Sequence, residues 1–150
     1  MNNKIKIISF NVNGIRSRIN QLSQVLKQHQ PDIVGLQETK VANEEFPFKD
    51  IEAMGYRAHI HGQKGHYGVA FLSKIDPSNI QCGFPSDDAD SQCRMIHGEF
   101  DINGRRIHLI NGYFPQGEGR AHPVKFPAKQ KFYADLLCYL NSEFSNEDAV

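Results

Sequence analysis

Polar residues at the ends of predicted strands carry the chemistry that this sequence most directly suggests. Asn11 follows the alternating strand Lys4–Phe10, and Glu38 follows the apolar strand Asp32–Leu36. A carboxylate beside an amide oxygen suits a hard cation such as Mg²⁺, which takes one or two protein carboxylates and completes its shell with water and phosphate oxygens. The pair suits Zn²⁺ poorly, because zinc prefers imidazole and thiolate ligands.

A third candidate, Tyr113, ends a later predicted strand. A phenol can orient a phosphate or stabilise developing charge, although a lone tyrosine is more often a half-buried packing residue. Plainer roles also stay open for the other two residues. Asn11 can form an Asx turn before a helix, and Glu38 can be an ordinary solvated acid.

Several other chemistries lack their sequence signals. The glycine-rich segment Gly62–Gly68 does not fit the Walker pattern, and no G-x-G-x-x-G follows the first strand. No G-x-S-x-G nucleophile elbow occurs, and Cys82, Cys93 and Cys138 form no C-x-x-C pair. The sequence therefore disfavours a dinucleotide fold, a serine hydrolase of that kind, a disulfide framework and a zinc knuckle.

The elements that would position Asn11 and Glu38 follow from the hydropathy pattern. Apolar residues recur at helical spacing over Ile15–His29, which predicts an amphipathic helix with Asn13 as its N-cap and an end before Pro31. A strand–helix–strand unit places its two strands parallel, so both end at one edge of the sheet. We therefore expect Asn11 and Glu38 to meet at a common rim.

The rest of the chain predicts an antiparallel run and two further helices. A short helix is expected over Phe48–Met54, and a last helix is expected with Pro127 in its first turn. The apolar side of that last helix includes Phe132, Leu136, Leu137 and Leu140. The expected strands are Tyr56–His61, Gly68–Ser73, Ile80–Phe84, Arg94–Ile102 and Arg105–Tyr113, the last two joined by the hairpin dipeptide Asn103-Gly104. The fold class is a mixed α/β sheet flanked by helices.

Composition is that of a globular domain, or part of one. The 150 residues carry 17 Lys+Arg and 17 Asp+Glu, and 39% are hydrophobic. The longest near-continuous apolar run, Ile33–Leu36, is far shorter than the roughly 20 residues that span a bilayer, so no membrane partner is expected. No secretion signal is recognisable, and we expect a cytoplasmic location. Basic residues gather between Gly104 and Lys131, which allows a phosphate-facing surface.

Four runs of residues occur together and in order along almost the whole chain. They read SFNVNGIR at 9–16, PDIVGLQETK at 31–40, HGQKGHYGVA at 61–70 and NGYFPQG at 111–117. Together they resemble the bacterial exonuclease III family, within the exonuclease–endonuclease–phosphatase superfamily. The shorter runs Gly83–Pro85 and Lys125–Lys129 strengthen the resemblance.

The resemblance implies a DNA-repair phosphodiesterase that depends on Mg²⁺, or on Mn²⁺ in its place. Such enzymes remove nucleotides from 3′ ends of duplex DNA, cut beside abasic sites and clean blocked 3′ termini. Carried over by position, the catalytic residues are Tyr113, Glu38 and Asn11, and the last two also bind the metal. Arg94, Gln116 and Lys125 match positions that contact DNA. The implied fold is a four-layer α/β sandwich, of which residues 1–150 form the N-terminal half.

The sequence departs from this family in length. Family members are nearly twice as long, and neither the Gly-Asp-x-Asn motif with the general-base aspartate nor the terminal Ser-Asp-His motif occurs here. We expect a partial domain, nearly inactive alone, because a general base typically contributes about 10²–10⁴-fold. The complete protein is expected to be monomeric, whereas this part could associate through an uncovered apolar sheet face.

Two other functions stay open on the sequence alone. An enzyme of the same superfamily could act on phospholipids or inositol phosphates instead of DNA. Alternatively, the basic run from Arg105 to Lys131 could belong to a non-catalytic module that binds nucleic acid.

Overall fold

Two sheets and three helices make up the computed structural model, which describes residues 4–150. The first sheet has the order β1 (Ile7–Asn11), β2 (Ile33–Gln37), β4 (Val69–Ser73), β3 (Arg57–His61). The second contains β5 (Asn79–Cys82), β6 (Met95–Ile102) and β7 (Arg105–Gly112). The helices are α1 (Ile19–His29), α2 (Phe48–Ala53) and α3 (Lys125–Glu143), with a 3₁₀ turn, η1, at Asn43–Glu45.

The strand pairing creates the rim that the sequence predicts. β1 and β2 are parallel, with Asn11 opposite Gln37 at their carboxyl ends, which confirms the expected strand–helix–strand unit. β4 pairs antiparallel with both β2 and β3, and the second sheet is antiparallel throughout. Glu38 therefore leaves β2 beside the last residue of β1.

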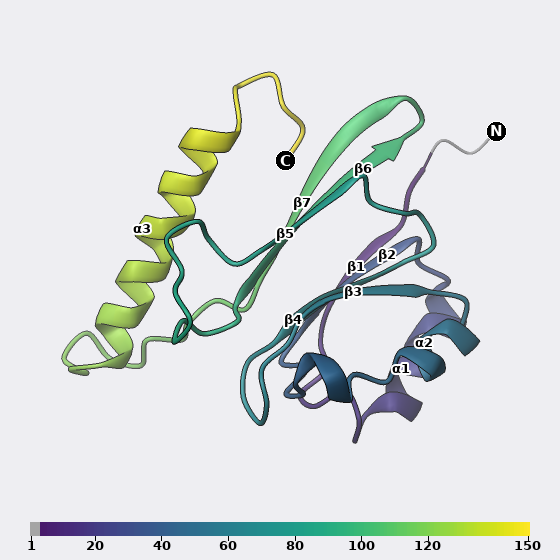
Figure 1. The fold of residues 1–150 in the computed structure, drawn as a ribbon, viewed down its shortest axis with the longest axis horizontal. Coiled ribbons are helices and arrows are strands. Elements are labelled where there is room, and N and C mark those ends of the chain that lie inside the picture. The colour runs from purple at the N-terminus through teal and green to yellow at the C-terminus, as the bar shows by residue number, and fades with distance from the viewer. Residues whose placement is uncertain (1–3) are drawn as a thin grey trace.

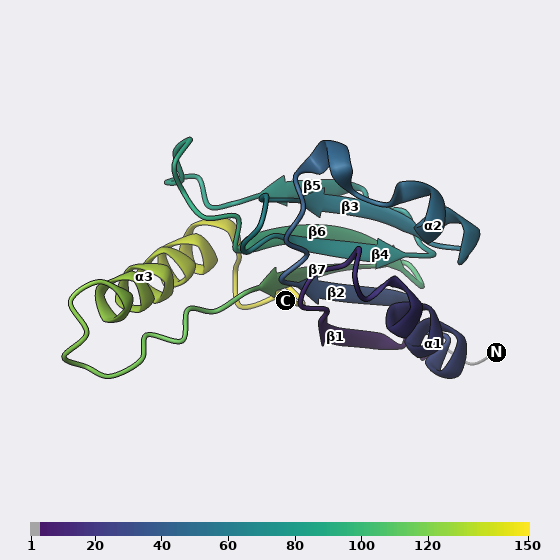
Figure 2. The same ribbon diagram turned by 90° about the horizontal axis from the view of Figure 1, so that it is seen from below.

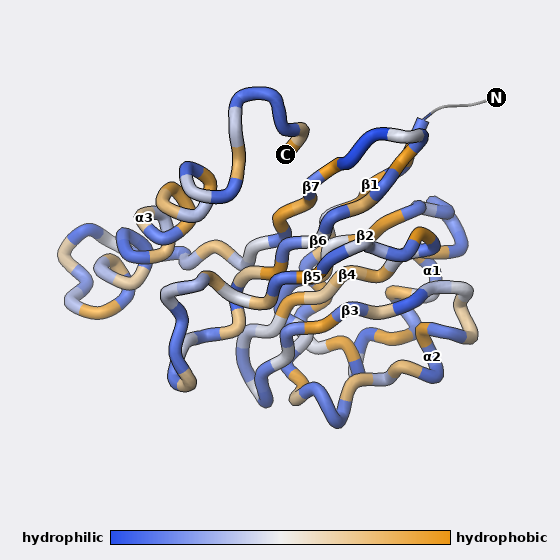
Figure 3. Tube along the Cα trace, turned by 45° about the horizontal axis from the view of Figure 1, so that its top comes forward, coloured by the Kyte–Doolittle hydropathy of each residue, from blue (hydrophilic) through white to orange (hydrophobic). Residues whose placement is uncertain are grey.

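The elements stack in four layers, with α1 and α2 on one outside, α3 on the other and the two sheets between (Figures 1 and 2). One core cluster, which includes Leu22 and Ile51, lies beneath α1 and α2. A second lies between the sheets and includes Phe71 and Phe100, whose rings meet edge to face at 5.7 Å. Hydrophobic residues concentrate in the strands and hydrophilic ones in the connections (Figure 3). The mixed α/β class and its flanking helices are confirmed.

The first helix starts later than predicted, and Asn13 is not its cap. α1 begins at Ile19 after Arg18, which makes no side-chain capping bond. Asn13 instead has φ +45°, and its amide oxygen accepts a hydrogen bond from Lys40. Ile15 is fully buried in the connection, where its N–H donates to Thr39, so tertiary packing overrides the helical periodicity there.

Two further expectations about apolar surfaces are corrected. Leu137 on α3 is 60% exposed, whereas Tyr139 and Phe132 face the core together with Phe84. The second sheet also covers much of the apolar sheet face that the sequence analysis expected to be open. An uncovered part remains at β1, where Ile7 is 44% exposed.

Smaller shifts in strand bounds follow from local backbone geometry. The predicted strand Ile80–Phe84 is β5 at Asn79–Cys82, because Gly83 turns the chain at φ +71° and sends Phe84 into the core beneath α3.

Among the described residues, no helix is both long and apolar enough to cross a bilayer.

Candidate active site at the sheet rim

Asn11 and Glu38 meet at the carboxyl ends of β1 and β2, as their strand positions predict. The side-chain amide of Asn11 donates to Glu38 Oε1 at 2.8 Å, while its oxygen accepts the backbone N–H of Asn13 at 3.0 Å. Asn11 thus forms the Asx turn that the plainer interpretation allowed and also holds the carboxylate. Its oxygen uses one of its two lone pairs in this backbone turn, and the Glu38 carboxylate keeps further lone pairs at the rim.

Lys40 completes the surroundings of this carboxylate, although the sequence analysis gave it no role. Its ammonium lies 2.9 Å from Glu38 Oε2 and donates to Asn13 Oδ1 at 2.5 Å. Partial burial acts to raise the pKa of Glu38, but hydrogen bonds from Asn11, Lys40 and Tyr113 outweigh it and lower that pKa below 4.5. The carboxylate, 18% exposed, is therefore ionised at neutral pH.

The backbone around the site is held in an uncommon conformation. Glu38, Lys40 and Tyr67 all have φ near +55°, a region that side chains other than glycine seldom occupy. Cross-links between the segments hold them there: Gly14 N–H donates to Glu38 O at 2.7 Å, and Lys40 N–H donates to Tyr67 O at 3.0 Å. Such strain persists where the surrounding structure over-determines it, and it is frequent at functional sites.

Tyr113 reaches the same rim from the second sheet. Its hydroxyl donates a hydrogen bond to Glu38, and its backbone N–H donates to Arg94 O at 2.7 Å. Burial and the bond to Glu38 raise the pKa of this phenol above its ordinary 10. Tyr113 therefore keeps its proton at neutral pH and acts as a hydrogen-bond donor.

Arg94 lies between two tyrosine rings beside the carboxylate. Its guanidinium carbon is 4.4 Å from the centre of the Tyr67 ring and 4.8 Å from that of Tyr113. It also donates to Tyr113 O at 2.9 Å and to Gln92 Oε1 at 2.6 Å. Stacking of this kind fixes a cation that stays charged. Tyr67, which the sequence analysis also missed, is the residue before Gly68 in the run at 61–70.

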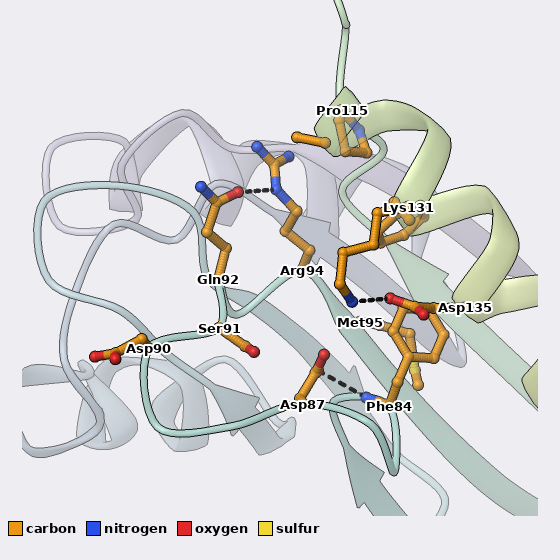
Figure 4. Close-up of a pocket in the computed structure, with 12 residues that line it drawn as sticks. Phe84, Asp87, Asp90, Ser91, Gln92, Arg94, Met95, Pro115, Lys131 and Asp135 are labelled. Carbon is orange, nitrogen blue, oxygen red and sulfur yellow. Dashed lines mark hydrogen bonds and ion pairs between the residues drawn. The ribbon is translucent and has the colours of Figure 1, made fainter. Parts of the chain in front are cut away.

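A pocket of about 220 Å³ opens beside Arg94, between the loop after β5 and helix α3. Its apolar wall comes from Phe84, Met95 and Phe132, and its edges are polar. Figure 4 shows Arg94 bonded to Gln92 on one side of this pocket and Lys131 bonded to Asp135 on the other. The pocket thus extends the surface that starts at Arg94 toward α3.

The other two predicted DNA contacts, Gln116 and Lys125, lie on the connection from Tyr113 into α3. The carbonyl of Gln116 accepts a 3.4 Å hydrogen bond from Lys129. Lys125 is the first residue of α3 and forms an ion pair with Glu118. The structure brings Arg94 to Glu38 and Tyr113 but places these two residues on a separate, exposed segment.

Beneath the rim, Asn111 joins the two sheets. Its side chain, 7% exposed, donates to Leu36 O at 2.9 Å and to Ala70 O at 3.0 Å, and it accepts from Gln37 Nε2 at 2.6 Å. These bonds fix the end of β7 to the ends of β2 and β4. Tyr113 is thereby placed over Glu38, a role that sequence reasoning could not assign to an asparagine two positions before the tyrosine.

The donor set fits a hard cation with few protein ligands. Among residues 4–150, the grouping of three metal-ligating His, Cys, Asp or Glu side chains occurs away from the rim, at His97, Glu99 and His108. The rim offers the carboxylate of Glu38, whose oxygens keep lone pairs beyond those that accept from Asn11 and Lys40. Proteins commonly bind Mg²⁺ through one or two carboxylates, with waters and phosphate oxygens as the other ligands.

Two stacked sheets between helices, with an ionised carboxylate, a phenol and a stacked arginine at one rim, define an α/β sandwich with a polar candidate site at the edge of its sheets. Residues 8–141 match the model of the Endonuclease/Exonuclease/phosphatase family, and the chain belongs to that family.

Its relatives include nucleases of DNA repair. The chain is 51% identical to exodeoxyribonuclease III of Haemophilus influenzae over 97% of its own length and 55% of that protein. It resembles an AP endonuclease from Archaeoglobus fulgidus with a TM-score of 0.83 and 37% identity, over 95% of this chain and 53% of that one. It also resembles the 3′ phosphatase NExo from Neisseria, whose structure is bound to a product DNA hairpin. The TM-score is 0.81 and the identity 33%, over 93% of this chain and 52% of that one. The chain thus spans about half the length of these relatives.

Proposed function

We propose that this chain belongs to a metal-dependent DNA-repair phosphodiesterase, acting as a 3′-to-5′ exonuclease on duplex DNA and as an endonuclease at abasic sites. The observation that carries the proposal is the rim itself, where an ionised Glu38 contacts Asn11, Lys40 and Tyr113, with Arg94 stacked beside them. The names of its relatives, an exodeoxyribonuclease and AP endonucleases, support this substrate class.

Glu38 would hold the metal, for which we propose Mg²⁺, with Mn²⁺ able to replace it. When bound, this ion would neutralise negative charge on the scissile phosphate. Asn11 belongs to the same metal site, and its amide N–H at 2.8 Å keeps the carboxylate turned toward the rim. A single protein carboxylate suffices, because phosphate and water oxygens complete the shell of such an ion.

The remaining side chains would bind and orient the phosphodiester. The Tyr113 hydroxyl, protonated at neutral pH, donates to a phosphate oxygen, and the stacked Arg94 supplies a fixed positive charge next to it. Gln116 and Lys125 would contact the DNA backbone further along, toward α3. Contacts of this type position a duplex without reading its bases.

Residues 1–150 would form one part of the catalytic domain, with the general base supplied by the other part. This follows from the span of the chain, about half of each relative, and from the missing Gly-Asp-x-Asn motif. We expect the 150 residues alone to cleave DNA very slowly, since general-base catalysis is typically worth about 10²–10⁴-fold. A monomeric state and a cytoplasmic location stay predictions.

The experiment compares the complete protein with its Glu38→Gln variant on duplex DNA that contains one abasic site, with Mg²⁺ present. We expect cleavage to fall by orders of magnitude, because the amide removes the charge that binds the ion. Glu45→Gln is the matched control, since Glu45 is exposed on η1, where it pairs weakly with Arg16 at 3.9 Å. Near-normal cleavage by Glu38→Gln, or greater activity on inositol phosphates than on DNA, would refute the proposal.

A further inference from the structure

Three metal-ligating side chains lie together outside the rim site, on the outer face of the second sheet. His97 and Glu99 alternate along β6, and His108 stands opposite Glu99 on β7. One ligand atom from each residue lies within 4.8 Å of the other two. This face is covered by α3 and the segment after it, whereas Glu38 belongs to the rim of the first sheet.

The two imidazoles are spaced almost as zinc ligands are. His97 Nε2 lies 3.0 Å from His108 Nδ1. With Zn–N bonds of about 2.0–2.1 Å and a tetrahedral angle, two nitrogens on one ion lie about 3.3 Å apart. A shift of a few tenths of an ångström and loss of the proton between the rings would therefore let both nitrogens face one cation.

A residue of α3 orients the first imidazole. The Tyr139 hydroxyl lies 2.8 Å from His97 Nδ1, which leaves Nε2 to face His108. Partners of this kind fix the tautomer and direction of metal-ligating histidines. Phe144 packs edge to face on both rings, at 5.4 Å from His97 and 4.9 Å from His108, and His97 is 4% exposed.

Glu99 supplies the third ligand and the negative charge. Its carboxylate accepts a 3.2 Å hydrogen bond from Asn79 and lies 4.0 Å from the Arg106 guanidinium, both weak competitors for its oxygens. Two imidazoles and one carboxylate, with a fourth position open, form a known type of zinc ligand set. We propose that His97, Glu99 and His108 bind Zn²⁺ and that Tyr139 is their positioning residue, so that the ion links the sheet to α3.

The test is a calorimetric titration of Zn²⁺ into the complete, chelator-treated protein with Mg²⁺ in large excess to occupy the Glu38 site. We expect one Zn²⁺ per chain. His108→Gln and Glu99→Gln should each weaken Zn²⁺ binding at least 10-fold. Circular dichroism checks that these substitutions, at partly exposed positions, leave the fold intact. His29→Gln, on the exposed end of α1, is the matched control and should bind as the parent does.

Two further readouts separate a metal site from a hydrogen-bonded chain of Tyr139, His97 and His108. Tyr139→Phe should keep the stoichiometry but lower the Zn²⁺ affinity by about 10–100-fold, the usual effect of removing such a partner. Co²⁺ in place of Zn²⁺ should give the strong visible absorption of a tetrahedral site, which His108→Gln abolishes. Failure to saturate at one Zn²⁺, or equal binding by parent, His108→Gln and Glu99→Gln, would overturn the proposal whatever the nuclease assay shows.

Discussion

At the scale of single residues, the charge of Glu38 is set by its neighbours more than by its exposure. Burial alone would favour the neutral acid, yet three donors, Asn11, Lys40 and Tyr113, reach the carboxylate and reverse the shift. The same bond raises the pKa of Tyr113, so one group is kept as an anion and its partner as a proton donor. This opposite tuning suits a cation and a phosphate that bind together.

The lowered pKa of Glu38 predicts a pH dependence of stability with a definite sign. The folded state favours the carboxylate more than the unfolded chain does, so the contribution is present above about 4.5 and lost as pH falls through the lowered folded value. Denaturant titrations should show that the stability of the parent relative to Glu38→Gln decreases on acidification below this pH. A difference that stays constant or grows would contradict the prediction.

At the scale of elements, local patterns predicted the strands better than the turns between them. Alternation and apolar runs located β1, β2 and the β6–β7 hairpin to within a few residues, and the parallel pairing placed Asn11 beside Glu38. The start of α1 was wrong, since the buried Ile15 serves the connection rather than the helix. Contacts across distant segments decide such positions, and a periodicity within one segment does not contain them.

Lys40 and Tyr67 show the same limit at the site. Their left-handed conformations arise because the segment after β2 pairs with the segment before β4, through Thr39 to Gly68 and Lys40 to Tyr67. No local sequence pattern in either segment predicts that pairing. The sequence therefore indicated the carboxylate and the phenol but missed the ammonium and the second aromatic ring that complete the rim.

Gly68 tests how closely these two segments must approach. It has φ +85°, and a β-carbon there would collide with the buried hydroxyl of Thr39. Gly65 has φ +79° with open space around it, so Gly65→Ala should cost only the left-handed strain of about 1–2 kcal/mol. We expect Gly68→Ala to lower the free energy of unfolding by clearly more.

A double-mutant cycle attributes the excess to the collision. In a Thr39→Ala background, Gly68→Ala should cost no more than Gly65→Ala does, because the obstructing hydroxyl is gone. Chemical denaturation of the four variants measures this. Equal costs for Gly65→Ala and Gly68→Ala in the parent background would show that the close approach does not matter.

At the scale of the whole molecule, the two sheets act as one platform for the site. The first sheet supplies Asn11 and Glu38, the second supplies Tyr113 and Arg94, and Asn111 connects them. The hydropathy pattern identified a mixed α/β fold, whereas the four-layer arrangement was implied by the family resemblance. Face-to-face packing depends on contacts such as Phe71 with Phe100, which lie far apart in the sequence.

Asn111→Ala should destabilise the molecule and loosen the site together. It leaves the carbonyls of Leu36 and Ala70 and the amide of Gln37 without this buried partner, at about 1–3 kcal/mol for each group that stays unsatisfied. We expect a loss of about 2–4 kcal/mol in the free energy of unfolding. Asn20→Ala, on the exposed side of α1, should change it by less than about 0.5 kcal/mol. A similarly small change for Asn111→Ala would show that these bonds do not hold the two sheets together.

Direct titration of Mg²⁺ or Mn²⁺ into the complete protein, without DNA, tests most directly whether Glu38 binds the ion. The parent and the exposed control Glu45→Gln should bind the ion with the same affinity. Glu38→Gln should bind it at least 10-fold more weakly, because the carboxylate is the charged ligand at this rim. Unchanged affinity in Glu38→Gln would contradict the claim and place the metal elsewhere in the molecule.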